Sequence, residues 1–196
     1  MSDNVKPYSL FTDFDISLFK MGKHYRLYNK LGSHVVEVDG VKGVYFAVWA
    51  PSAKNVSVVG DFNFWLEGDH PLYVRWDGSG IWEGFIPGLT EGTLYKYKIH
   101  SHNNNIKTEK ADPFARYCEH PPKTASVVCD PKHQWKDNDW MSKRASVNSL
   151  DKPISIYEVH LGSWKKRIDE NRSLTYKELA EDLVNYLKEM NFTHVE

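Results

Sequence analysis

Few side chains in this sequence could do chemistry, and a tryptophan is the most suggestive of them. Trp65 ends a turn-rich loop that follows a predicted strand. Tryptophan and tyrosine offer a flat apolar face with a polar edge, which suits a ligand platform as well as a core. Aromatic residues make up 14% of the chain, including seven tryptophans, so such platforms are available. Trp65 is a candidate ligand contact, and packing of its ring within the fold is the competing explanation.

Metal binding and acid–base catalysis have weaker support. His100 and His102 lie two residues apart in a polar stretch. No cysteine, aspartate or third histidine gathers near them at the spacing of metal ligands. Glu158 points away from its apolar strand neighbours and has no partner carboxylate, so we assign it no catalytic role. We predict no metal site and no cofactor.

Composition and charge exclude several classes of protein. The 25 lysines and arginines nearly balance the 26 aspartates and glutamates, giving a net charge of -1. Without a basic excess, nucleic acid is not an expected partner. The first residues are polar, unlike a secretory signal, and no apolar run approaches the about 20 residues that cross a membrane. Cys118 and Cys129 form no disulfide framework. We expect a cytoplasmic protein with neither nucleic acid nor membrane among its partners.

Short strands separated by turns are predicted throughout residues 34–130. Asp39-Gly40 is typical of a hairpin turn, here between strands at 35–38 and 44–49. Within the strand at 94–99, tyrosines alternate with lysines, as in a strand with one buried face. About seven short strands with turns every roughly 8–12 residues predict an immunoglobulin-like β-sandwich. The other expected strands are 56–59, 81–86 and 125–128.

The segments on either side of the sandwich have less regular patterns. Residues 1–33 mix aromatic and basic side chains without clean periodicity, and we interpret them as an N-terminal lead-in whose first part is only partly ordered. Residues 131–152 are polar and are expected to connect the sandwich to the C-terminal region of the chain. Trp135 and Trp140 lie within this connecting segment, where we expect them to act as aromatic anchors.

Residues 153–196 follow the order strand, helix, strand. A β-branched run after Pro153 predicts the first strand, and Thr175-x-x-Glu178 is a capping box that predicts the start of a helix. Apolar residues then recur on one face over 176–190, and Asn191 suits the left-handed conformation that ends a helix. Residues 192–196 begin a second strand. This order predicts parallel strands joined by a right-handed crossover, cut off as the second strand begins.

Taken in order, the motifs of this sequence resemble the 1,4-α-glucan branching enzymes of the α-amylase superfamily. The parts similar to their family 48 carbohydrate-binding module are 43–51, 60–65, 79–83, 95–97, 110–113 and 122–126. YEVHLGSW at 157–164 and FTHVE at 192–196 resemble the first strand of the superfamily's (β/α)₈ barrel and the start of its second. The resemblance extends from Leu18 to the end of the sequence.

The resemblance implies a transferase that cleaves α-1,4-glucan chains and moves the released segment to a 6-hydroxyl, forming the α-1,6 branches of glycogen. Such enzymes use a carboxylate nucleophile and a carboxylic acid, and in this superfamily both lie on later barrel strands. A full barrel takes about 250 residues, far more than residues 153–196 provide. No catalytic residue is therefore assigned, and this chain alone is predicted to be inactive. The implied partners are α-1,4-glucan (glycogen, amylose, maltooligosaccharides) and the remainder of the barrel.

The resemblance also implies three carbohydrate-binding residues, namely Trp65, Lys96 and Asn63. In related glycogen-binding modules a tryptophan at the first position stacks on a glucose ring, and a lysine at the second hydrogen-bonds a sugar hydroxyl. Modules that bind glycogen tightly carry another tryptophan in the loop after the lysine strand. Here residues 100–105 contain no aromatic side chain. A one-sided platform is expected to bind weakly.

Two other interpretations of this chain fit its residues. The chain could be a non-catalytic module that binds α-glucan or orients the barrel, or a fragment of a related glycogen debranching enzyme. The motifs at 158–164 and 192–196 favour branching. His160 follows a predicted barrel strand, where it could touch substrate or make a structural hydrogen bond. The apolar face of the helix at 176–190 suits a barrel sheet, so in this chain it must pack on the sandwich, pair with another chain, or fray.

Overall fold

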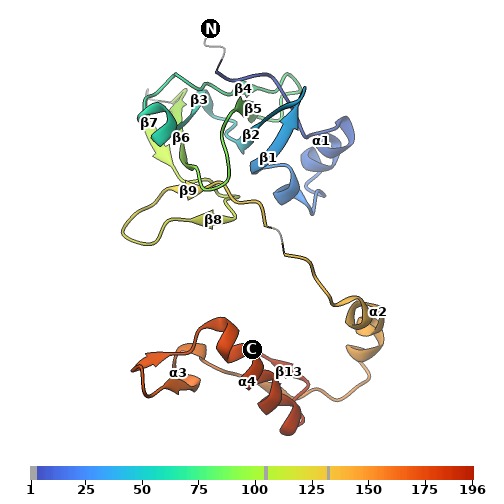
Figure 1. Ribbon diagram of the computed structural model, residues 1–196. Helices are drawn as coiled ribbons and strands as arrows, with labels where there is room; N and C mark the ends of the chain where they lie inside the picture. Colours follow the sequence, from blue (N-terminus) through green and yellow to red (C-terminus); the bar gives the residue numbers. More distant parts are fainter. Residues whose placement is uncertain (1–3, 104–105, 132) are drawn as a thin grey trace. The chain divides into compact units, whose positions relative to one another are not determined.

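The computed structural model describes residues 4–103, 106–131 and 133–196. The chain divides into two compact units (Figure 1): unit 1 is Met1–His133 and unit 2 is Gln134–Glu196. Most regular structure in unit 1 is antiparallel β-sheet, which confirms the prediction of a mainly β protein. Among the helices that the structure describes, none has the length and apolar character needed to cross a lipid bilayer.

Unit 1 contains two antiparallel sheets. The first has the strand order β1-β2-β5-β4 and the second the order β3-β6-β9-β8, with β7 also paired to β6. The first sheet comprises β1 (Gly32–Val38), β2 (Val41–Trp49), β5 (Ile81–Pro87) and β4 (Tyr73–Val74). The second comprises β3 (Ala53–Gly60), β6 (Leu94–Ser101), β9 (Ser126–Val127), β8 (Tyr117–Cys118) and β7 (Lys107–Lys110).

The two sheets pack face to face across one core. Because side chains alternate between the faces of a strand, every second residue of the central strands enters this core. The buried cluster draws on both sheets; among its members are Val44, Phe46, Val48, Val56, Val58, Tyr95 and Tyr97. The Phe46 and Tyr95 rings meet edge to face with their centroids 4.9 Å apart. Burying side chains of this size stabilises the fold by about 1.5–3 kcal/mol each, so the sandwich has a core of its own.

The hairpin predicted from Asp39-Gly40 is confirmed. Val38 pairs with Val41, which leaves a two-residue turn between β1 and β2. Both turn residues have positive φ, 50° for Asp39 and 77° for Gly40. Aspartate and glycine tolerate this conformation, and such a turn matches the twist of the strands that it joins.

The N-terminal segment is packed against the sandwich, so the expectation that its first part is only partly ordered is wrong for the described residues 4–20. Lys6 exchanges backbone hydrogen bonds of 2.8 and 2.9 Å with Phe85. The helix α1 (Asp13–Lys20) begins at a capping box formed by Thr12 and Asp15, and a 3₁₀ helix (Leu27–Asn29) follows it. A second core on the other face of the first sheet contains Phe11, Ile16, Leu31, Tyr45, Ala47 and Ile81.

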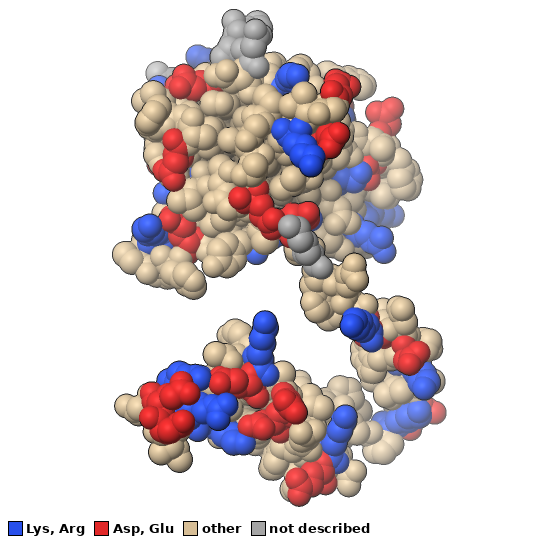
Figure 2. Space-filling view, in the orientation of Figure 1, with Lys and Arg blue, Asp and Glu red and all other residues tan. Residues whose placement is uncertain are grey.

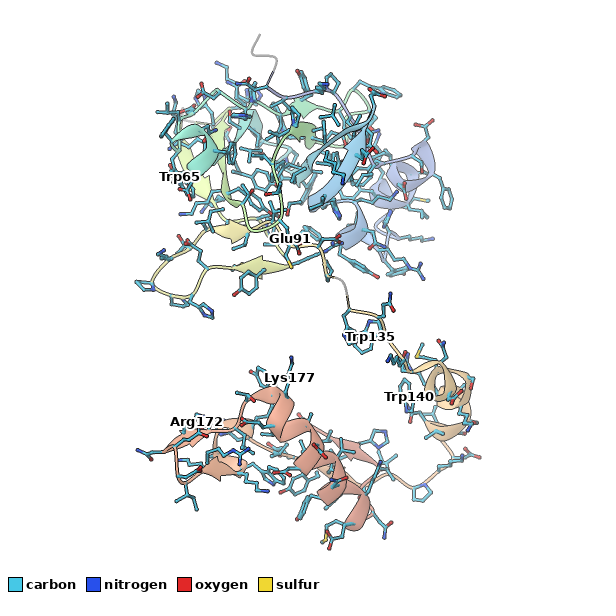
Figure 3. The ribbon with its side chains drawn as sticks, viewed as in Figure 1. Trp65, Glu91, Trp135, Trp140, Arg172 and Lys177 are labelled. Atoms are coloured by element: carbon cyan, nitrogen blue, oxygen red, sulfur yellow. The ribbon has the colours of Figure 1, made fainter. Side chains whose placement is uncertain are left out.

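Unit 2 begins with a helix where a polar connecting segment was expected. This helix, α2, spans Asn138–Val147 and has no buried residue. Figure 3 labels Trp135 and Trp140 in this part of the chain, and their side chains are 76% and 50% exposed. Their role as aromatic anchors stays a prediction. The Trp140 ring lies beneath the guanidinium group of Arg144, 5.6 Å from its centroid.

The rest of unit 2 has the predicted order of strand, helix and strand. Strand β10 (Ile156–Tyr157) pairs in parallel with β13 (His194–Val195), as predicted. Helix α4 (Tyr176–Glu189) begins at the Thr175–Glu178 capping box and is followed by Asn191 at a φ of 56°. Between β10 and α4 lie the short helix α3 (Leu161–Trp164) and a hairpin of β11 (Lys166–Arg167) and β12 (Arg172–Ser173).

Candidate functional site

The loop that carries Trp65 has an unusual backbone. Strand β3 ends at Gly60, a 3₁₀ turn (Asp61–Asn63) follows, and then Phe64 and Trp65 adopt φ values of 53° and 60°. Bulky residues rarely take this left-handed conformation. Each such residue costs on the order of 1–3 kcal/mol, and strain of this kind tends to gather at functional sites. Two in succession mark this loop as a candidate site.

Asn63 holds the loop in this conformation from beneath. Its side chain is buried, and its Oδ1 accepts a 2.9 Å hydrogen bond from the Gly60 amide. Its Nδ2 donates to the Val58 carbonyl at 3.0 Å and lies 3.0 Å from Nδ1 of His70. Burial lowers the pKa of His70, which favours the neutral ring whose Nδ1 can accept from the amide.

Glycine is required at position 60. A Cβ atom there would lie 2.2 Å from the carbonyl oxygen of Leu94 on the neighbouring strand. The Gly60 carbonyl also accepts a 2.9 Å hydrogen bond from the Trp65 amide, which closes the loop. The close approach of β3 and β6 at this point brings the loop over the outer face of β6.

Trp65, which is labelled in Figure 3, lies beside Lys96 on that outer face. The half-buried indole donates from Nε1 to Asp61 Oδ1 at 2.7 Å, which fixes the plane of the ring. The ammonium of Lys96 lies 5.9 Å from the ring centroid. Both side chains line an open hollow of about 490 Å³, which we call the Trp65 hollow. Its other lining residues are Asp61, Leu94, Glu109, Glu119, Lys123, Thr124 and Ala125.

The Glu109 carboxylate of the Trp65 hollow suits binding more than bond cleavage. Glu109 accepts a 2.9 Å hydrogen bond from Lys98, and this bond holds the pKa of the carboxyl below its ordinary value. Glu109 is therefore ionised at neutral pH and can accept hydrogen bonds, but it cannot deliver a proton. Glycoside cleavage needs a protonated carboxylic acid. The flat indole, the lysine donors and the carboxylate acceptors together match a polyhydroxylated ring with an apolar face.

Of the three predicted binding residues, the structure brings two together at the surface. Trp65 and Lys96 share the hollow, whereas Asn63 is 3% exposed and lies under the loop. The amide of Asn63 is engaged with the backbone, so the residue shapes the site and does not face its opening. In the stretch expected to lack a second aromatic platform, Asn104 and Asn105 lie outside the described residues.

A buried ionic cluster in unit 1 was not predicted from the sequence. Arg75 bonds Glu83 Oε1 at 2.6 Å and Asp77 Oδ2 at 2.8 Å. The second oxygen of Glu83 accepts from the Tyr45 hydroxyl at 2.6 Å and from the Ser9 hydroxyl at 2.9 Å. Burial and the neighbouring charge of Glu83 raise the pKa of Tyr45 well above its ordinary value, so the phenol keeps its proton.

The geometry of this cluster indicates that it stabilises the fold. Both carboxylate oxygens of Glu83 are occupied by protein donors. Ser9 belongs to the N-terminal segment and Glu83 to the first sheet, so the cluster fastens one to the other. Its members are spread over residues 9–83 in no recognisable spacing, and each is an ordinary polar residue in the sequence. No local sequence signal could have identified it.

In unit 2, the side chains that were considered as candidates make local contacts. The His160 ring lies 2.8 Å from the Ser163 hydroxyl at the start of α3. The Trp164 indole donates to the Tyr157 hydroxyl at 3.0 Å. Tyr186 of α4 completes a cluster with both rings, at centroid distances of 5.3 Å from Tyr157 and 5.8 Å from Trp164. These contacts hold the unit together.

Comparison with known proteins shows which families the chain resembles. Residues 30–115 match the family described as Carbohydrate-binding module 48 (Isoamylase N-terminal domain), and this range contains Trp65 and Lys96. The 1,4-alpha-glucan branching enzyme GlgB of Aquifex aeolicus (strain VF5) is 54% identical over 193 residues, or 98% of this chain. The chain is related to the branching enzymes. A second such enzyme, from Thermosynechococcus vestitus, is 49% identical over 94% of the chain.

The relation covers nearly all of this chain but a minor part of each branching enzyme. The chain spans 30% of the Aquifex enzyme and 27% of the Thermosynechococcus enzyme. Among solved structures, apo pullulanase from Klebsiella pneumoniae aligns with a TM-score of 0.49 at 22% identity. That alignment covers 69% of this chain and 15% of the pullulanase, and it is too distant to bear on function.

Proposed function

We propose that this chain is the N-terminal portion of a 1,4-α-glucan branching enzyme and that unit 1 binds α-1,4-glucan at the Trp65 hollow. The observation that carries this proposal is the pairing of Trp65 with Lys96 on a strained, internally braced loop. A glucose ring stacks on the indole, Lys96 donates to its hydroxyls, and the nearby carboxylates accept from them. Asn63 supports the loop from below. Weak binding is expected, because stacking is available on one side of the sugar.

The proposal assigns the chemistry to carboxylates outside these 196 residues. The enzyme would cleave an α-1,4 linkage by the retaining route and transfer the segment to a 6-hydroxyl. Residues 153–196 would form the first βαβ unit of a (β/α)₈ barrel, supported by the parallel pairing of β10 with β13 around α4. An immunoglobulin-like module at 34–130, a lead-in before it, a connecting segment at 131–152 and a cytoplasmic location stay predictions.

The binding proposal can be tested by calorimetric titration of the whole chain with maltoheptaose. Trp65→Ala is expected to weaken binding by at least about tenfold, which corresponds to about 1.4 kcal/mol, and Lys96→Ala by less. Trp76→Ala is the matched control, because Trp76 is an exposed tryptophan of the same unit outside the hollow. Equal affinities of the Trp65→Ala variant and the unmodified chain would contradict the proposal and favour a module that only orients the barrel.

The absence of catalysis by this chain has a separate test. Branching shortens the linear segments of amylose and lowers the absorbance of its iodine complex. The purified chain is expected to leave that absorbance unchanged over a long incubation. A sustained decrease that scales with the concentration of the chain would contradict the assignment of the chemistry to the missing barrel.

A further inference from the structure

The Trp65 hollow does not end at the residues that surround Trp65. A second hollow of about 520 Å³ adjoins it, and the two share the lining residues Leu94, Glu119 and Lys123. The far end of the second hollow is formed by Tyr117 of β8 and by the β8–β9 loop. The Tyr117 side chain is 50% exposed. A continuous open surface therefore has Trp65 at one end and a second accessible aromatic ring at the other.

The register of the second sheet places Tyr117 on the same face as Lys96. Leu94 pairs with Val127, and Val127 in turn pairs with Tyr117. Directly opposed residues of antiparallel strands point to the same side of the sheet, and Leu94 and Lys96 share a side because they lie two apart on β6. The adjacent row, with Tyr95 and Ser126, faces the core, where both are buried. Tyr117 thus belongs to the outer face.

The spacing between the two aromatic ends suits an extended chain of sugars. Two strand separations lie between β6, which carries Lys96, and β8, which carries Tyr117. At about 4.8 Å per separation, the distance across the sheet is about 10 Å. Figure 1 shows the β8–β9 hairpin with its loop extending to the side on which Figure 3 labels Trp65. A single glucose ring cannot contact both ends, whereas several linked rings can.

The surface between the two ends has both apolar and polar parts. Leu94 and Val127 supply an apolar floor. Above it, Lys123 lies 3.4 Å from Glu119, whose other oxygen accepts from the Ala125 amide at 3.2 Å. The carboxylate is thereby fixed in orientation, while the ammonium of Lys123 is largely exposed. Sugar hydroxyls lying over the apolar floor would find a donor and an acceptor beside them.

We propose that Tyr117 is a second aromatic contact for α-1,4-glucan, and that the bound chain runs from Trp65 across Leu94 to Tyr117. This inference rests on the proposed function, because it extends the same ligand beyond the Trp65 hollow. The end of β6 and the described part of the loop after it, residues 100–103, bring no aromatic residue to the site. Strand β8, two strands away from β6, supplies the aromatic ring of Tyr117 instead. Binding should therefore depend on the length of the glucan.

The test compares maltotriose with maltoheptaose on the whole chain and its variants. Tyr117→Ala is expected to weaken maltoheptaose binding by about fivefold or more and to leave maltotriose binding unchanged, whereas Tyr117→Phe, which keeps the ring, retains most of the affinity. Tyr25→Ala is the matched control, since Tyr25 is an exposed tyrosine of unit 1 outside both hollows. Thermal unfolding of each variant shows whether the edge strand β8 still folds.

The outcomes separate this inference from the proposed function. If Trp65→Ala weakens binding of both sugars and Tyr117→Ala weakens neither, unit 1 binds glucan but the extension to Tyr117 is wrong. If Tyr117→Ala weakens both sugars equally, or Tyr117→Phe loses as much as Tyr117→Ala, the length-dependent stacking role is also wrong. If the unmodified chain binds neither sugar, or if Trp65→Ala has no effect, the proposed function itself fails and the inference fails with it.

Discussion

The two units of this chain differ in how much of their own surface they bury. The largest fully buried side chains all belong to unit 1, with Tyr45, Tyr95, Tyr97, Phe46 and Phe85 at their head. In unit 2, the buried side chains among the described residues are Leu179 and Leu183. Unit 1 combines strands of up to nine residues into two packed sheets, whereas unit 2 pairs strands of two residues each. Burial on this scale is the main source of folding free energy.

The ion pairs of unit 1 are also more deeply buried than those of unit 2. In unit 1, the Arg75–Glu83 pair is buried, and its atoms are held by several partners. In unit 2, the ion pairs are exposed, including Lys165–Asp182 at 2.6 Å and Arg172–Glu178 at 2.9 Å. Figure 2 shows lysine and arginine intermingled with aspartate and glutamate on the visible side of unit 2. Exposed pairs contribute about 0–1 kcal/mol each, so they cannot replace a core.

The proposed binding surface therefore rests on a scaffold with a core of its own, which unit 2 lacks among its described residues. Helix α4 leaves Tyr176, Val184 and Met190 exposed on its apolar side. Parallel strands are normally covered on both faces, and a barrel sheet would supply that cover. Packing on the sandwich, pairing with another chain and fraying all stay predictions for this helix face, of which Leu179 and Leu183 are buried.

A large difference between the units is expected in backbone amide exchange. Amides of β2 and β5 exchange through global unfolding of unit 1, whereas those of α4 exchange through local opening of unit 2. We expect α4 to exchange at least about 100-fold faster, equivalent to a difference of about 2.7 kcal/mol. Hydrogen–deuterium exchange of a verified monomer measures this directly. Equal protection of 176–190 and the sandwich strands would show that α4 is buried by a partner within the same chain.

Core substitutions should affect the units separately. Phe46→Ala is expected to lower the free energy of unfolding of unit 1 by about 3–5 kcal/mol, because it removes a buried aromatic ring and leaves a cavity. Leu183→Ala is the matched change in unit 2 and should leave the unfolding midpoint of unit 1 unchanged. Urea unfolding followed by amide exchange of the β2 and β5 residues reports on the sandwich alone. A shift of that midpoint by Leu183→Ala would mean that the units unfold as one.

The loop beneath Trp65 should be sensitive to the loss of Asn63. Asn63→Ala leaves the Gly60 amide and the Val58 carbonyl without their partner and is expected to cost about 1–3 kcal/mol. Because the backbone conformation of Trp65 depends on this support, maltoheptaose binding should weaken as well. Asn103→Ala, an exposed asparagine of unit 1, should stay within about 0.5 kcal/mol of the unmodified chain. Unchanged stability of the Asn63→Ala variant would contradict the role of Asn63 in supporting the loop.

The smallest effect concerns the capping boxes, one in each unit. Burial raises the pKa of Asp15, but bonds from the Thr12 amide and Lys30 outweigh it, and the net pKa lies below the ordinary value. A carboxyl whose pKa is lowered by folding stabilises the fold above its unfolded pKa of about 4 and loses that contribution as the pH falls. Unit 1 should therefore lose stability between about pH 5 and pH 3, and Asp15→Asn should reduce this slope. If the stability of the variant changes with pH as steeply as that of the unmodified chain, groups other than Asp15 cause the acid sensitivity.

The capping box of unit 2 should also lose its stabilising effect as the pH falls, and amide exchange of helix α4 can detect this loss. A side-chain hydrogen bond from Arg172, followed by bonds at Thr175, holds the pKa of Glu178 below its ordinary value. Acidification should therefore loosen the first turn of α4 without affecting the sandwich. The amide exchange of residues 176–179 as a function of pH checks this, with Glu178→Gln as the variant that removes the dependence.

Local sequence patterns predicted the elements that are specified by neighbouring residues. Asp39-Gly40 identified a hairpin because each residue tolerates positive φ, and Thr175 with Glu178 marked the start of α4 through a four-residue motif. The alternation around Lys96 placed that lysine on the outer face of its strand. The parallel pairing of β10 with β13 followed from the order of the elements. In each case the determining physical constraint lies within a short stretch of chain.

Features that depend on distant contacts were missed. The N-terminal segment is ordered because Ser9 and Phe11 meet groups more than 30 residues away, which no local periodicity records. Asn63 was expected to face a ligand, and its burial depends on His70 and on the path of β3. The role of Tyr117 emerges from the register of three strands. The sequence could indicate candidate binding residues, but the shape of the surface between them depends on the fold.

We propose that glucan binds to the outer face of the second sheet in unit 1. The most direct measurement is hydrogen–deuterium exchange of the whole chain with and without saturating maltoheptaose. We predict slower exchange at 60–66, 94–98 and 117–125, with no change in unit 2. Protection confined to unit 2, or no protection in the 60–66 loop at saturation, would contradict the account.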